Sequence, residues 1–143
     1  MNPHPTDLLR CADELTLESL SEPTVYRTFR LGSSTVLVSH MFRLTQTAIT
    51  AKTCPSHSTD IGPWTLTPCD AVPNAAWDSL MTALNAIDFW HMPSPIENGS
   101  FDGVQYVVEG FRDGDYRCFS LRKPHPALTE LVADLCDQCV IAG

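Results

Sequence analysis

Two apolar stripes with helical periodicity stand out in the second half of the chain. Between residues 74 and 90, apolar side chains recur at i, i+3, i+4, i+7 and i+10, at Trp77, Leu80, Met81, Leu84 and Ile87. After the Pro124–Pro126 segment, a second stripe comprises Leu128, Leu131, Val132, Leu135, Cys136 and Cys139. This spacing predicts two amphipathic helices, each burying one face. A sparser run of leucines predicts a further helix within residues 1–22, ending before Pro23 because the residue preceding proline avoids the α region.

β-branched and aromatic residues mark the strands. Residues 24–31 and 35–43 flank the Gly32–Ser34 turn, which predicts a hairpin, and residues 45–53 predict a third strand at an edge or half-exposed position. Residues 104–111 and 116–122 flank Asp113-Gly114, where glycine supplies the positive φ of a tight turn. These patterns predict two hairpins and an extra strand.

Prolines and glycines punctuate the segment between the third strand and the first strong helix. We expect residues 53–72 to form a long loop that carries two cysteines and one short strand near residues 64–67. Together the elements predict an α+β fold, with an antiparallel sheet of about five strands and two to three helices in two layers. The 143 residues fit a single domain spanning residues 1–143.

Composition narrows the class of protein. The hydrophobic fraction of 43% and charged fraction of 18% are typical of a soluble globular chain. No basic stretch precedes an apolar run near residue 1, and no apolar run approaches bilayer length, so we expect a cytoplasmic protein without membrane contact. The six cysteines are scattered, and we expect reduced, mostly packed thiols.

Charge is arranged in blocks along the chain. The net charge is −8, residues 23–52 carry four basic residues and no acid, and residues 53–111 carry acids but no Lys or Arg. This balance argues against nucleic-acid binding and favours a basic protein partner. The residues expected to contact it are Asp60, Asp70, Asp78, Asp88, Glu97, Asp102 and Trp90. The alternative is that these acids pair with basic strands inside the fold.

Two further groups have candidate chemistry. Cys54 and His57, together with the C-x-x-C pair Cys136 and Cys139, have residue types that bind zinc, although the pair continues an apolar helix stripe. Recognisable nucleophile and phosphate-binding motifs are absent, so no catalytic residue and no cofactor is expected. Phe89 and Trp90 are expected to wedge a helix end against the sheet, or alternatively to present an aromatic hot spot to a partner.

One stretch resembles a known sequence pattern. Trp77-x-x-Leu80, Phe89-Trp90-x-Met92-Pro93, Asp102-Gly103-x-x-Tyr106-x-Val108-Glu109-Gly110 and Gly114-x-Tyr116 are the matching residues. They resemble small uncharacterised bacterial proteins in which F-W-x-L-P leads into D-G-x-x-W-x-L-E-G and a G-x-Y-H turn. The resemblance covers residues 77–122, and this chain differs at Met92, Tyr106 and Arg117. It implies a helix–hairpin core and no activity.

The functional hypothesis is a non-enzymatic acidic binding protein. An immunity or inhibitor protein that occludes a basic partner, such as a bacterial toxin, best matches the small size and the acidic blocks. The alternatives are a small zinc-binding or cysteine-dependent enzyme, and a structural subunit of a larger complex. The sequence leaves the oligomeric state open.

Overall fold

The structure is a computed structural model that describes a large part of the chain. The described residues are 17, 24–31, 38–57, 60–61, 64–69, 71–91, 105–121 and 126–138. The helix expected within residues 1–22 and the Gly32–Ser34 turn lie outside them, except for Leu17, which is fully buried.

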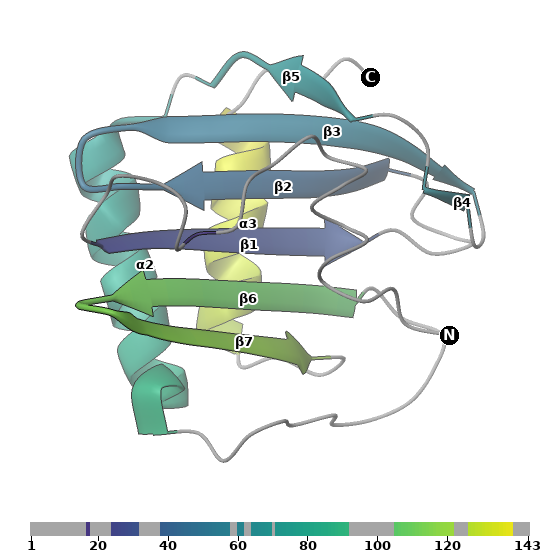
Figure 1. Ribbon diagram of the computed structural model, residues 1–143. Helices are drawn as coiled ribbons and strands as arrows, with labels where there is room; N and C mark the ends of the chain where they lie inside the picture. The colour runs from purple at the N-terminus through teal and green to yellow at the C-terminus, as the bar shows by residue number, and fades with distance from the viewer. Residues whose placement is uncertain are drawn as a thin grey trace.

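The described strands form one antiparallel sheet (Figure 1). They are β1 (Thr24–Leu31), β2 (Val38–Leu44), β3 (Ile49–His57), β4 (Asp60–Ile61), β5 (Thr65–Thr67), β6 (Gln105–Arg112) and β7 (Asp115–Leu121). Their order across the sheet is β4-β3-β2-β1-β6-β7, and β5 pairs with β3 beside β4. A β-meander of β1, β2 and β3 therefore meets the β6–β7 hairpin where β1 pairs with β6.

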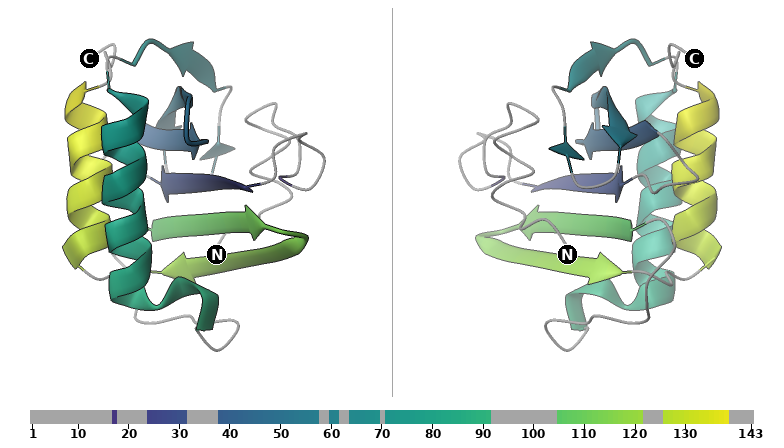
Figure 2. Two further views of the ribbon diagram at one scale, coloured as in Figure 1. Left: turned by 90° about the vertical axis from the view of Figure 1, so that its left-hand side faces the viewer. Right: turned by 90° about the vertical axis from the view of Figure 1, so that its right-hand side faces the viewer.

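Both long helices cover the same face of this sheet. Figure 2 shows α2 (Pro73–Ile87) and α3 (Pro126–Gln138) side by side on one face, and the short 3-10 helix η2 (Phe89–His91) follows α2. The expected α+β class, with an antiparallel sheet and a helical layer, is confirmed.

The β1–β6 pairing joins segments about 80 residues apart in the sequence. It runs without interruption from Thr24 opposite Arg112 to Leu31 opposite Gln105. Side chains alternate between the two faces of a strand, so Tyr26 and Thr28 point toward the helices while Arg27 points away. The same register places Tyr26 opposite Gly110 and Arg27 opposite Glu109.

The third strand differs from its predicted position. β3 begins at Ile49 and continues to His57, and it lies inside the sheet, with β2 on one side and β4 and β5 on the other. A turn at residues 45–48 precedes it, in which the Thr45 N–H donates to the Ala48 carbonyl and the Ala48 N–H donates to the Thr45 hydroxyl. This turn lacks Gly, Pro, Asn and Asp, which explains why the sequence did not reveal it.

The loop expected at residues 53–72 is wrong in part. The end of β3 and two short strands occupy much of it, and only the strand near residues 64–67 was anticipated. The second hairpin, in contrast, is confirmed. Asp113 and Gly114 have φ of 51° and 87°, the paired positive values that a two-residue type I′ turn requires.

Helix α2 starts and ends by local backbone chemistry. Pro73 stands at its first turn, where a missing N–H costs nothing, and Asp88 ends it in the left-handed conformation with φ 54°. The Asp88 N–H bonds to carbonyls of the last turn. The helix therefore ends before Phe89 and Trp90, and the chain continues into η2.

Both faces of the sheet carry buried side chains. Toward the helices, Tyr26, Phe42, Val108 and Phe119 pack with the apolar stripes of α2 and α3 in a single cluster. On the opposite face, Val25, Met41, Cys54 and Val107 are also at most 1% exposed. Burial on both faces explains why apolar side chains occur at adjacent positions of a strand, as Val107 and Val108 do on β6.

Candidate functional surface on the helix layer

The outer surface of the helix layer carries acids without bases. Neither α2 nor α3 contains Lys or Arg. The exposed carboxylates are Asp78 on α2 and Glu130, Asp134 and Asp137 on α3. In the part of the chain that the structure describes, none of these four carboxylates forms an ion pair. We call these four residues the acidic helix layer.

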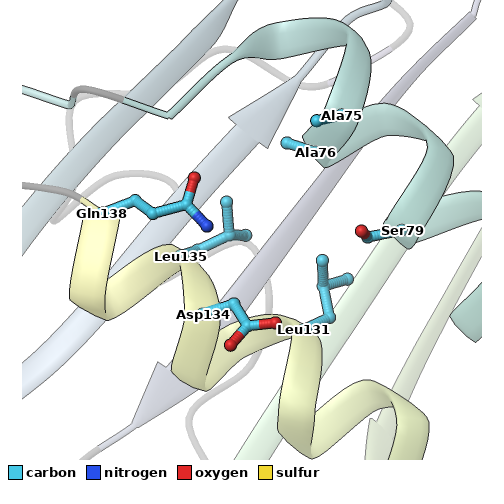
Figure 3. A pocket seen from close by; sticks show the side chains of 7 residues that line it. All are labelled: Ala75, Ala76, Ser79, Leu131, Asp134, Leu135 and Gln138. Carbon is cyan, nitrogen blue, oxygen red and sulfur yellow. The ribbon is translucent and has the colours of Figure 1, made fainter.

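A groove separates the two helices at this surface. On the α2 side its walls are short, because Ala75, Ala76, Ser79, Thr82 and Ala83 line it. Two adjoining cavities of about 50 and 200 Å³ open along it and share Ser79, Leu131 and Asp134. Figure 3 shows the smaller cavity, with Leu131, Leu135 and Gln138 extending from α3 toward α2. Leu131 and Leu135 are buried, so the groove floor is apolar and its rim is acidic.

The structure describes the side chains of only three of the seven expected contact residues. Asp60, Asp70, Glu97 and Asp102 have side chains outside the described set. Asp78 is exposed on α2, as expected. Asp88 is exposed at the end of α2, where its carboxylate lies 2.8 Å from Nδ1 of His91.

The groups that surround Trp90 differ in charge from the acidic helix layer. Its ring N–H donates to the Tyr26 hydroxyl at 3.2 Å, and the Arg112 guanidinium lies 4.2 Å from its ring centroid. Arg117 donates to its backbone carbonyl. Trp90 is half-buried and held by Tyr26 and two arginines, so its surroundings are basic rather than acidic.

Phe89 wedges the end of α2 against the sheet, as the aromatic corner predicted. Its ring packs edge-on against Phe119 at 5.4 Å and against Tyr26 at 6.3 Å between centroids. Gly110 makes this possible, because an added Cβ would lie 2.8 Å from both Phe89 Cε2 and Tyr26 Cε1. The glycine of the E-G pair in the resembling pattern therefore has a packing role in this chain.

Glu109 is buried and does not contribute to the acidic surface. It is 1% exposed, and Arg27 holds it bidentately, with Nε donating to Oε2 at 2.7 Å and Nη2 donating to Oε1 at 3.1 Å. The Tyr116 hydroxyl also donates to Oε1, at 2.7 Å. For this one acid, pairing with a basic strand inside the fold is what the structure shows.

The same network makes two neighbouring groups hard to ionise. Burial, reinforced by the Glu109 carboxylate, raises the pKa of the Tyr116 phenol far above its ordinary value. Burial and the nearby Glu109 charge raise the pKa of the Cys118 thiol to about 11. Because the thiolate is the nucleophilic form, Cys118 is not poised for nucleophilic chemistry near neutral pH.

The candidate zinc ligands do not come together where the structure describes them. Cys54 is buried on the sheet face that points away from the helices, whereas Cys136 packs on α3 against the helix-side cluster. The sheet lies between these two thiols. The side chain of His57 and all of Cys139 lie outside the described set, within which no three His, Cys, Asp or Glu side chains group in a way that could hold a metal ion.

Among the cysteines that the structure describes, one is oxidised. Cys69, beside β5, is disulfide-bonded to a partner outside the described residues, while Cys54, Cys118 and Cys136 are in no disulfide. The expectation that all six thiols are reduced is wrong at Cys69. Scattered spacing cannot reveal such a bond, because cysteines distant in sequence are joined only when the fold brings their Cβ atoms within bonding distance.

Glu130, Asp134 and Asp137 were missed as candidate contact residues. They follow the long acidic block and lie in a segment identified mainly by its apolar stripe. A signal was available, since residues 126–138 contain three acids and no base, all off the apolar face. What the sequence could not supply was the neighbour, because only packing places α3 beside α2.

Comparison with protein-family models, with curated proteins and with solved structures found no match. Among the described residues, neither helix combines the length and apolarity that crossing a bilayer requires.

Proposed function

We propose that this chain is a non-enzymatic binding protein of the immunity or inhibitor type, which occludes a basic protein partner such as a bacterial toxin. The observation that carries the proposal is the acidic helix layer, with four exposed carboxylates on two helices that have no basic residue. A surface of one sign steers an oppositely charged partner and fixes its orientation.

The described cavities favour protein contact over small-molecule chemistry. Ligand pockets for small molecules usually enclose about 300–1,000 Å³. The groove cavities, at about 50 and 200 Å³, are smaller. A third cavity of about 390 Å³, between β3 and β5, lies within that range, but Thr, Ile, Leu, Ala, Pro and the oxidised Cys69 line it. None of these groups is a general acid, a general base or an activated nucleophile.

Cys69 bears on where the protein acts. Disulfides persist in oxidising compartments and are rare in the reducing cytosol. The disulfide at Cys69 opposes the expected cytoplasmic location, so the proposal is not tied to that compartment.

The test is co-expression with the product of the adjacent gene, followed by titration calorimetry of the purified pair at low and high salt. We expect binding at micromolar concentration or tighter, with an affinity that falls as salt screens the charges. Absence of any complex at micromolar concentration would contradict the proposal. Turnover of a small compound, abolished by one side-chain replacement, would also contradict it.

A further inference from the structure

We infer that the groove between α2 and α3 is the docking site for a segment of the basic partner that carries arginine or lysine, with one cationic side chain entering the groove beside Asp134. This inference rests on the proposed function and adds the place and the chemistry of the contact. Its features are the short α2 wall, the acidic α3 rim and the absence of any base in either helix.

The space suits single side chains. The two cavities lie next to one another along the groove, since they share Ser79, Leu131 and Asp134. Alanine and serine on α2 leave this room, since longer residues at positions 75, 79 and 83 would fill it. Leu131 lines both cavities, so the methylene stem of Arg or Lys can pack over it while the charged head stays at the rim.

The charge favours a cation. Glu130 and Asp134 stand one helical turn apart on α3, and like charges at this spacing destabilise a helix slightly. In the described part of the chain, neither carboxylate forms an ion pair that relieves this repulsion. A guanidinium between them would relieve it and could bond a carboxylate bidentately.

The remaining polar groups at the rim fit the same occupant. The Ser79 hydroxyl and the Gln138 side-chain carbonyl can each accept a hydrogen bond from a donor-rich cation. Phosphate groups would instead meet the unpaired carboxylates of Glu130 and Asp134 and be repelled. The chemistry of the groove therefore selects a cationic protein segment.

The probe is a helical peptide of about 15 residues, with arginines four apart, titrated into the full-length ¹⁵N-labelled protein at about 50 mM salt. The control peptide has glutamine in place of each arginine. We expect the amide signals of Ser79, Leu131 and Asp134 to shift with the arginine peptide alone. Shifts confined to other surfaces, or equal shifts with the glutamine peptide, would overturn the inference.

A charge-matched pair of variants separates the groove from net charge. Glu130→Gln/Asp134→Asn should weaken peptide binding by about tenfold or more, because both rim carboxylates are removed. Asp113→Asn/Asp115→Asn removes the same charge at the exposed β6–β7 turn, where asparagine tolerates the positive φ of residue 113, and should change binding by less than about twofold. Equal weakening by both variants would overturn the groove as the site.

The same variants distinguish this inference from the proposed function. A partner protein that binds the wild type and Glu130→Gln/Asp134→Asn equally well would overturn the groove and leave the proposed function standing. A partner whose affinity falls only with the groove variant would support both. If no basic protein binds, the proposed function fails, and docking of such a partner in the groove fails with it.

Discussion

Glu109 connects the two halves of the sheet through its side chain as well as its backbone. Its carboxylate accepts two hydrogen bonds from Arg27 and one from Tyr116, and all three residues lie on the face away from the helices. A buried pair of this kind contributes little over a well-packed apolar pair, but a single unpartnered member is costly. The pair instead helps to fix the register of β1 against β6, because a one-residue slip between these strands would separate the charges.

Replacing Glu109 with glutamine should destabilise the protein strongly. Glu109→Gln leaves the Arg27 charge buried without its counter-charge, and we expect a loss of about 3 kcal/mol in the free energy of unfolding. Urea unfolding followed by tryptophan fluorescence measures it. The double variant Arg27→Met/Glu109→Leu should lose less than the single one, because no buried charge remains. A single-variant loss below about 1 kcal/mol would contradict the assignment of this pair as buried and coupled.

The raised pKa of the Cys118 thiol predicts how the free energy of unfolding changes at alkaline pH. Its folded-state pKa of about 11 lies above the ordinary 9.0, so the unfolded chain ionises first as pH rises. The stability contributed by the neutral thiol is thus fully present below pH 9.0 and is lost as pH rises toward about 11.

The measurement is the free energy of unfolding between pH 8.5 and 10.5, compared with that of Cys118→Ala. The wild type should lose stability more steeply than the variant, by at most about 1.4 kcal/mol per pH unit. Tyr116, whose raised pKa acts in the same direction, remains in both proteins, and the variant keeps the two largest causes of its shift, burial and the Glu109 charge. Parallel curves would show that the thiol is not buried as described.

At the scale of elements, the corner after α2 connects the helix layer to the sheet. The left-handed Asp88 ends the helix and turns the chain so that Phe89 enters the space above Gly110. Trp90 then reaches the Tyr26 hydroxyl, so three consecutive residues orient α2 on β1 and β6. The motif residues in this corner act through packing and hydrogen bonds.

Gly110→Ala should show how tight this corner is. The added methyl group would meet the rings of Phe89 and Tyr26 at 2.8 Å, and we expect a loss of about 1–3 kcal/mol from overpacking. Thermal unfolding by circular dichroism measures it. Combining Gly110→Ala with Phe89→Leu should cost less than the sum of the two single changes, since leucine frees space at the contact. Strict additivity would contradict the contact.

The described part of the molecule is a β-meander and a β-hairpin, joined where β1 pairs with β6, with two helices covering one face of the sheet. The register between β1 and β6 decides which of their side chains lie side by side on each face. The packing of α3 beside α2 brings acids from segments about 50 residues apart onto one surface. The net charge of −8 is consequently not spread evenly, because Glu109 is neutralised inside while the acidic helix layer stays unpaired.

The disulfide at Cys69 can be tested on the purified protein. Peptide mapping of the alkylated, unreduced protein should find Cys69 in a disulfide-linked peptide, with Cys54, Cys118 and Cys136 unlinked. Reduction, or Cys69→Ser, should lower the free energy of unfolding by about 2–4 kcal/mol. Quantitative alkylation of Cys69 without a reductant would contradict the bond.

The local elements followed from the sequence because their signals are local. The apolar stripes located α2 and α3, and Asp113-Gly114 specified its own turn through backbone preference. The sequence did not predict the β2–β3 turn, because the Thr45 hydroxyl stabilises it by accepting a hydrogen bond from the Ala48 N–H, in place of the usual glycine or asparagine. Asp78 could be named as a candidate contact because an exposed acid on an amphipathic helix needs no tertiary information.

Tertiary structure alone decided what lies beside what. The β1–β6 pairing, the Arg27–Glu109 contact, the placement of α3 beside α2 and the bond at Cys69 all join residues far apart in the chain. Such contacts depend on the free energy of burying whole faces together, to which each residue contributes only a small part. The periodicity of the apolar residues therefore predicts which face each helix buries. The groove and its unpaired acids form only when the two helices pack side by side on one sheet.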